Sequence, residues 1–186
     1  MTEDRAHVAG PHGRTSDRQG IHEELERVRA DFHHLVSNAA PADLRRATNG
    51  TRWTNQQMLW HMAFGYLIVQ RLLPLVRMLG RLPPPLSRGL AATLNAVRRP
   101  FHLINYLGGC GGALVFHGPR LTRRLDRTLD QLHRRLDDEP DEALNRRMHF
   151  PVDWDPFFRD TMTLEQVYRY GTQHYDLHRT QLTLEQ

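Results

Sequence analysis

The chain has 186 residues, which is long enough for one domain with a hydrophobic core and short for two. A hydrophobic fraction of 39% excludes a disordered chain, and a formal net charge of only +4 gives no indication of a nucleic-acid-binding protein. All 25 basic residues are arginine, a bias that is typical of a GC-rich genome. The single cysteine, Cys110, excludes an internal disulfide framework, and no apolar secretory segment stands at the N-terminus, so we expect a cytoplasmic protein.

The N-terminal part is rich in charge, glycine and serine, so residues 1–19 are predicted to form a disordered tail before a single domain over residues 20–186. A first helix ending near Asn38 follows, because apolar residues recur at steps of three and four: Ile21, Leu25, Val28, Phe32 and Leu35. A second helix begins after Thr54, which is predicted to form a capping box with Gln57.

The second helix and the segment after it contain several helix breakers. Pro74 is expected to kink or end the helix, and a run of three prolines from Pro83 to break it completely. A short helix is predicted over residues 87–97, and the segment after Pro100 is rich in glycine. The apolar stretches within residues 58–118 are interrupted by charged residues, histidine and glycine, so a membrane span is not expected. Membrane association through residues 58–118 is the least favoured of the alternatives.

Two further helices complete the pattern. The third long helix starts at Gly118, with proline in its first turn, carries a leucine stripe and stops before Pro140. Residues 140–162 are expected to form a loop, and a final helix begins with a second capping box at Thr163. The predicted fold is therefore all-α: a four-helix bundle with a long, partly helical crossover insert at about residues 78–118.

Three histidines fall on the inward faces of these helices. His174 and His178 are four residues apart, so they share one helix face, which continues the apolar stripe that starts at Leu164. His61 occupies the first inward position of the second helix. A lone inward histidine is usually a core residue, but three on two inward faces would cost too much desolvation as packing alone. The pattern indicates one divalent metal ion bound by His61, His174 and His178.

Residues beside these histidines are candidates for a pocket. Gly65 and Gly171 each lie about one turn from an inward histidine, and a helical glycine costs up to about 1 kcal/mol relative to alanine, so each needs a reason. Room for an ion and a ligand is one reason, and close approach of two helices is the other. Tyr170, one turn before His174, could place its hydroxyl near the ion, although packing is the commoner role of a helical tyrosine.

Two segments of the sequence form a recognisable pattern. Residues 51–65 read TRWTNQQMLWHMAFG, and residues 170–182 read YGTQHYDLHRTQL. They resemble the W-[ST]-x5-6-H and H-x-x-x-H-x-x-Q segments of the DinB-like superfamily, the metal-binding four-helix bundles related to stress-inducible bacterial proteins and low-molecular-weight-thiol transferases. The resemblance implies that the histidine of the first segment and both histidines of the second are metal ligands, and that Gln181 matches a frequent glutamine. The insert is unlike the usual short crossover of that family.

The resemblance implies a metal-dependent enzyme, with a thiol S-transferase that uses a thiol such as mycothiol as the first hypothesis. Imidazole ligands suit Zn, Ni, Co or Fe(II), and the sequence does not distinguish among them. Hydrolysis or isomerisation at the same metal is a second hypothesis, and a non-catalytic metal-binding stress protein is a third. The expected partner is a small-molecule substrate and not a nucleic acid, with a homodimer as an open alternative.

Other reactive residues are assigned simpler roles. His102, His117 and His149 are isolated along the sequence, so loop or surface positions are favoured over a role as a further ligand or a proton relay. Cys110 lies among glycines with no neighbour that would activate its thiol, and we expect it to be inert.

The acidic and aromatic residues near the final helix were also considered as parts of a site. Asp176 and Glu165 are expected to face outward, so neither is assigned to orient an imidazole. A group of apolar residues is expected to plug the end of the bundle, with an aromatic wall for substrate as the secondary interpretation: Trp154, Pro156, Phe157 and Phe158.

Overall fold

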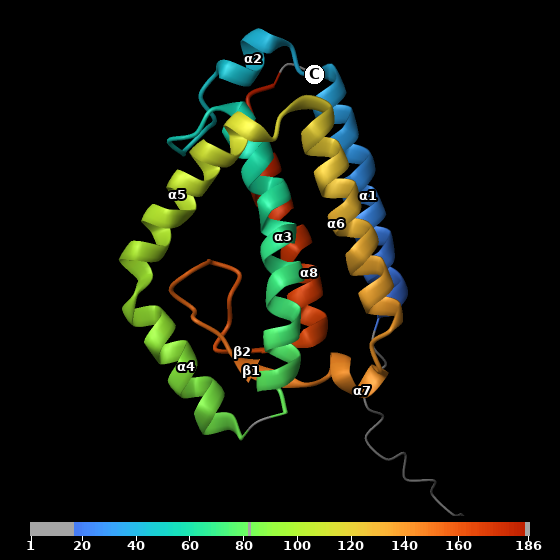
Figure 1. Cartoon of the computed structure of the whole chain (residues 1–186), viewed down its shortest axis with the longest axis vertical. Helices are drawn as coiled ribbons and strands as arrows, with labels where there is room; N and C mark the ends of the chain where they lie inside the picture. Colours follow the sequence, from blue (N-terminus) through green and yellow to red (C-terminus); the bar gives the residue numbers. More distant parts are fainter. Residues whose placement is uncertain (1–16, 82, 185–186) are drawn as a thin grey trace, which may run out of the picture.

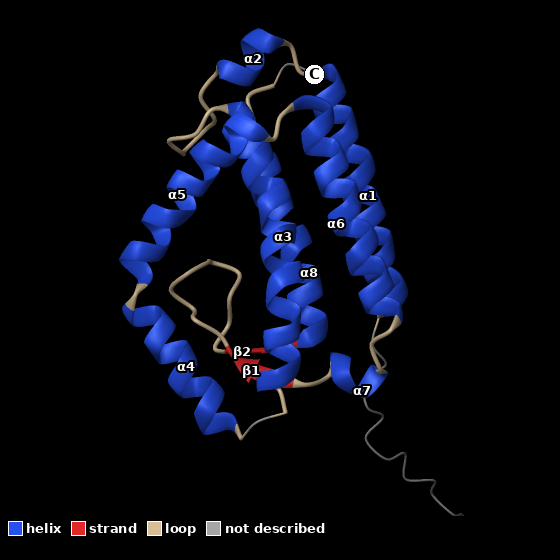
Figure 2. Cartoon of the chain, viewed as in Figure 1, coloured by secondary structure: helices blue, strands red, loops and turns tan. Residues whose placement is uncertain are grey.

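The computed structural model describes residues 17–81 and 83–184 of the chain. Four long helices form the bundle: α1 (Arg18–Asn38), α3 (Asn55–Leu79), α6 (Gly118–Asp137) and α8 (Leu164–Arg179). In Figure 1, α1 lies beside α6 and α3 lies beside α8, and each helix also packs against a member of the other pair. The all-α bundle that the sequence predicts is therefore confirmed, and Figure 2 shows one small hairpin as its only strands among the described residues.

The start of α1 bears on the predicted N-terminal tail. Residues 1–16 of that tail lie outside the described residues. Asp17 caps α1, with its side chain accepting a hydrogen bond from the backbone N–H of Gly20 at 2.9 Å. The helix thus begins two residues before the predicted domain start at residue 20.

The apolar stripes predicted for the first and third long helices form the core. All five stripe residues of α1 are buried, and so are those of α6: Leu121, Leu125, Thr128, Leu132 and Leu136. Acidic residues of α6 pair with α1, for example Asp130 with Arg29 at 2.7 Å.

Helix α3 continues through Pro74 to Leu79, so of the two predicted outcomes, a kink or an end at that proline, the end is wrong. A proline inside a helix leaves the carbonyl of the residue four positions earlier without its N–H partner. Here that carbonyl belongs to Gln70, and it accepts a hydrogen bond at 2.5 Å from the guanidinium of Arg135 on α6. The neighbouring helix therefore replaces the missing donor.

Helix α3 is also the one described helix that is long and apolar enough to cross a membrane. Over half of its most apolar window, 56%, is buried inside the protein, because α3 contacts α5, α6 and α8. This burial is what the central core helix of a soluble protein shows.

The crossover insert is almost wholly helical, beyond the partly helical insert that was predicted. It consists of α4 (Pro84–Ala96) and α5 (Arg98–Val115), which form an arm along one side of the bundle in Figure 1. The glycines of α5 allow its close approach to α3, since a Cβ at Gly109 would lie 2.9 Å from the indole nitrogen of Trp53 and one at Gly112 would collide with the indole of Trp60. The Trp60 Nε1 donates to the carbonyl of Gly108 at 3.0 Å.

The region predicted as a loop at residues 140–162 contains a short helix and a hairpin. Besides α7 (Asp141–Leu144), strand β1 (Arg147–His149) pairs antiparallel with β2 (Thr161–Thr163), with Met148 opposite Met162. The segment between the strands, residues 150–160, extends toward α4. A further short helix, α2 (Pro41–Arg45), precedes α3.

Candidate metal centre

Two capping boxes fix where the histidine-bearing helices begin. Before α3, the Thr54 side chain accepts a hydrogen bond from the backbone N–H of Gln57, and before α8 the Thr163 side chain accepts one from that of Gln166. Each glutamine side chain in turn accepts from the backbone N–H of its threonine, as the sequence predicts. Because α3 and α8 pack side by side, the first inward turn of α3 meets the last turns of α8. This meeting brings the one histidine of α3 to the two of α8.

The residues that follow α8 form hydrogen bonds at and just before the start of α3. The buried side chain of Asn55, at the start of α3, donates to the hydroxyl of Thr183 at 2.9 Å and accepts from its backbone N–H at 3.0 Å. The Gln181 carbonyl accepts from the backbone N–H of Asn49 at 2.8 Å. These bonds hold the C-terminal end of α8 against the N-terminal end of α3.

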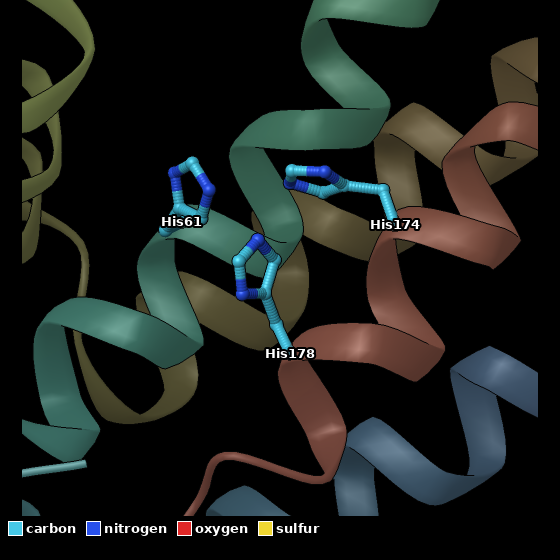
Figure 3. Close-up of side chains that lie close together, drawn as sticks. All are labelled: His61, His174 and His178. Atoms are coloured by element: carbon cyan, nitrogen blue, oxygen red, sulfur yellow. The ribbon is translucent and has the colours of Figure 1, made fainter. Parts of the chain in front are cut away.

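The three histidines converge on one point. One ring nitrogen from each of His61, His174 and His178 lies within 4.8 Å of the others, and Figure 3 shows the three rings facing a common space between α3 and α8. His61 is 4% exposed and His174 6%, while His178 is partly buried. The arrangement could hold a single metal ion.

Unsatisfied nitrogens are the structural test of whether a cation fits. The Nδ1 of His61 and the Nε2 of His174 are buried and have no hydrogen-bond partner among the described residues. An unpartnered buried nitrogen costs on the order of 1–3 kcal/mol, so two in one cluster need a reason. A divalent cation satisfies such nitrogens by accepting their lone pairs, and the residues present therefore fit a metal.

The other nitrogen of each α8 imidazole has an acceptor that orients the ring. Asp155, in the segment between β1 and β2, places its Oδ2 3.2 Å from the Nδ1 of His174. Gln181 places its Oε1 2.7 Å from the Nδ1 of His178. Acceptors in these positions keep the proton on Nδ1 and leave Nε2 free toward the centre, as is usual for metal-binding histidines.

Burial keeps two imidazoles of the cluster, those of His61 and His178, uncharged. Burial, and then the neighbouring His174 and His178, hold the pKa of His61 well below its usual value. Burial and the nearby His174 lower the pKa of His178 to about 4. Burial disfavours the charged form of Asp155, but hydrogen bonds, first from His174, outweigh this effect and hold its pKa below the usual value. The site thus offers the neutral imidazoles of His61 and His178 beside one carboxylate, which suits a cation.

Most of the chain matches a known protein family. The DinB superfamily matches residues 24–182, which is most of the chain and includes both segments that carry the predicted resemblance. The chain belongs to the DinB superfamily. No curated protein and no solved structure matches it.

In this DinB-superfamily protein, the two glycines near the histidines, Gly65 and Gly171, lie against different side chains. A Cβ at Gly65 would lie 2.8 Å from Cδ2 of His174, so this glycine makes room for an imidazole of the cluster. A Cβ at Gly171 would lie 2.7 Å from the ring of Tyr66, so close helix packing, the other reason considered, accounts for that glycine.

Two aromatic side chains border the cluster. Tyr170 donates its hydroxyl to Asp155 at 2.8 Å and lies 3.5 Å from the Nδ1 of His174, so it contacts the residue that orients an imidazole. Burial raises the pKa of Tyr170 above its usual value, so its hydroxyl remains protonated. The indole of Trp53 covers His61, with ring centroids 4.2 Å apart.

Most of the residues given simpler roles lie away from the cluster. Asp176 faces outward and pairs with Arg27 at 2.8 Å, and Glu165 lies beside Arg169, as expected for residues that orient no imidazole. Cys110 is a free, partly buried thiol. His149 has a carboxylate partner in Asp160 at 3.2 Å.

The residue that sequence reasoning missed is Asp155. It lies in the sequence DWDPFF, which was considered only for its aromatic residues. Trp154 and Phe158 of that group line a cavity beside His174. An acidic residue directly after Trp154, in the segment before the histidine helix, was the available signal.

Proposed function

We propose that this protein is a metal-dependent transferase that uses a low-molecular-weight thiol of the mycothiol type as its co-substrate. The observation that supports the metal dependence is the cluster of three buried imidazoles with unpartnered nitrogens. A cavity that reaches His174 supports an enzyme over a metal-storage protein, because storage needs no space for a second ligand. We place the protein in the cytoplasm and expect a small molecule as its substrate.

The residues that would hold the cation are His61, His174 and His178. A divalent metal bound by three neutral histidines keeps open positions and lowers the pKa of a thiol or water that occupies one of them. Zn, Ni, Co and Fe(II) all accept imidazole ligands, so the donor set admits each of them.

The chain's own contribution is orientation and exclusion of water. Asp155 and Gln181 fix the two α8 imidazoles through their Nδ1 atoms. The Tyr170 hydroxyl, held by Asp155, keeps that carboxylate in place and is itself a neutral donor. In the proposed transfer, the thiol sulfur releases its proton to solvent water and forms a bond to an electrophilic carbon of the substrate, whose leaving group departs with the electrons of the bond that breaks.

Cobalt substitution tests the proposal. In the Co(II)-loaded protein, adding mycothiol should change the visible absorption bands of the metal, while the same concentration of an S-methylated thiol should not. His174→Ala should lose the metal, and His34→Ala, which removes an exposed histidine of α1, should keep it. A Co(II) spectrum that responds to no thiol would overturn the transferase proposal and leave hydrolysis, isomerisation or a non-catalytic metal-binding role.

A further inference from the structure

A cavity of about 310 Å³ lies beside His174, which is the one histidine of the three that lines it. It lies between α3, the crossover insert and the segment that follows β1, and it reaches His174 and Tyr170 of α8. On α3, one face supplies side chains at steps of three and four residues: Phe64, Ile68, Leu72 and Leu75. The cavity therefore begins beside the cluster and runs along α3 toward the insert.

The lining of this cavity is mostly apolar, and Asn105 of α5 and His149 of β1 are its polar residues besides the group at the cluster. Helix α4 contributes Leu90 and Leu94, and the segment after β1 contributes Phe150, Trp154 and Phe158. Among the described residues no arginine lines the cavity, although all 25 basic residues of the chain are arginine, and Asp155 is the one acidic residue of this described lining. The lining therefore offers no countercharge to a carboxylate or phosphate along its length.

Three of the polar lining residues form one group. Asp155, Tyr170 and His174 all line the cavity and are hydrogen-bonded to one another, so they occupy a single position beside the metal site. A second lining histidine, His149, is paired with Asp160. A ligand that fills the cavity would thus meet polar atoms at its metal end and hydrocarbon beyond it.

The crossover insert forms one wall of the cavity and is hydrogen-bonded to the segment that carries Asp155. The Trp154 indole donates to the carbonyl of Leu94 on α4 at 2.9 Å, and the backbone N–H of Asp153 donates to the Asn95 side chain at 3.3 Å. These bonds tie the segment that carries Asp155 to α4. Ile104 of α5 lies at the rim, where it is 68% exposed and open to an entering ligand.

From these observations we infer that the substrate of this site has an uncharged, apolar body with one polar group at its metal end. The inference rests on the proposed metal-dependent function and adds the class of substrate. The cavity is about twice the size of an apolar cavity of about 150 Å³ that holds one benzene, so the apolar body has on the order of ten non-hydrogen atoms, as in a medium alkyl chain or a bicyclic ring.

A series of n-alkyl hydroxamates tests this inference on the metal-loaded protein. The hydroxamate head binds the metal, and the alkyl tail extends into the cavity, so the dissociation constant should fall about threefold for each added methylene from acetohydroxamate to octanohydroxamate. Equal affinity along the series would overturn the inference while leaving the metal site intact. Failure of acetohydroxamate itself to bind would instead count against the proposed metal site.

A matched pair of variants on α4 locates the tail. Leu90→Trp fills part of the cavity and should weaken octanohydroxamate at least about tenfold while changing acetohydroxamate less than about twofold. Leu86→Trp, one turn earlier and 57% exposed outside the cavity lining, should change neither. Equal effects of the two substitutions on the long ligand would contradict the inference, and thermal unfolding of each variant checks that it folds.

A neutral fluorescent probe makes the test independent of the metal. N-phenyl-1-naphthylamine should bind the metal-free protein with enhanced emission, and Leu90→Trp but not Leu86→Trp should reduce that binding at least about fivefold. Binding that responds to neither substitution would place the probe outside the cavity and overturn the inference.

Discussion

The contact between Asp155 and His174 gives the sharpest test of how the metal site is built. The Asp155 side chain is 12% exposed, and its Oδ2 faces both the Nδ1 of His174 at 3.2 Å and the Tyr170 hydroxyl at 2.8 Å. Its Oδ1 accepts from the backbone N–H of Phe157 at 2.9 Å. Asp155→Asn keeps the shape and one acceptor oxygen but turns the other oxygen into an NH₂ donor.

The consequence of Asp155→Asn follows from the donors that face it. If the amide oxygen keeps the bond to Phe157, the NH₂ group meets two donors, the Nδ1–H of His174 and the Tyr170 hydroxyl. The imidazole then favours the tautomer with its proton on Nε2, the nitrogen that faces the metal site. Loss of such an orienting partner typically weakens metal binding 10- to 100-fold, which is about 1.4–2.8 kcal/mol.

Chelator competition at pH 7 measures this effect. The zinc dissociation constant of Asp155→Asn should rise by about one to two orders of magnitude. Asp153→Asn is the matched control, because Asp153 is an exposed residue of the same segment, and it should bind zinc like the wild type. A zinc affinity of Asp155→Asn within about twofold of the wild type would refute the assigned role of the carboxylate.

Three further predictions address the glycines and the pH dependence. Gly65→Ala should weaken zinc binding at least about tenfold in chelator competition, because its methyl group would push against the His174 ring. Gly112→Ala should lower the melting temperature, because its methyl group collides with an indole of α3, whereas Gly111→Ala, with open space, should raise it slightly through helix propensity. Titration of His178 should contribute a loss of up to about 3 kcal/mol to the unfolding free energy of the metal-free protein, measured by urea titration, as the pH falls from 6.5 to about 4, because this buried imidazole binds its proton more readily in the unfolded chain. The buried His61, whose pKa is also lowered, adds to this loss.

Each of these predictions has an outcome that contradicts it. Wild-type zinc affinity in Gly65→Ala would show that the His174 ring does not need that space. Equal melting temperatures for Gly111→Ala and Gly112→Ala would contradict the close packing of α5 on α3. For the pH dependence, His178→Gln should reduce the loss of stability between pH 6.5 and 4, and an unchanged loss would assign it to other groups.

The bundle could be predicted from the sequence because its signals are local. The stripe from Ile21 to Leu35 repeats at helical spacing. The capping boxes at Thr54 and Thr163 each consist of residues that lie within four positions of the sequence, and each marks the start of a helix. The convergence of the three histidines was also predictable, since each continues an apolar face and a bundle turns such faces toward one another.

The remaining features depend on contacts between distant residues, which no local pattern reveals. Helix α3 continues through Pro74 because Arg135, far along the chain, replaces the missing donor. Asp155 reaches His174 only because β1 and β2, each three residues long, return the chain beside α8. The glycines of α5 read as breakers in the sequence, but in the structure they are the positions where the helix passes over tryptophan rings.

Anomalous scattering from crystals of the protein loaded with zinc tests the central claim most directly. We predict one peak at the zinc edge, about 2.0–2.1 Å from a ring nitrogen of each of His61, His174 and His178. A peak at any other place in a fully loaded protein, or three imidazoles that stay apart with no ion between them, would contradict the claim.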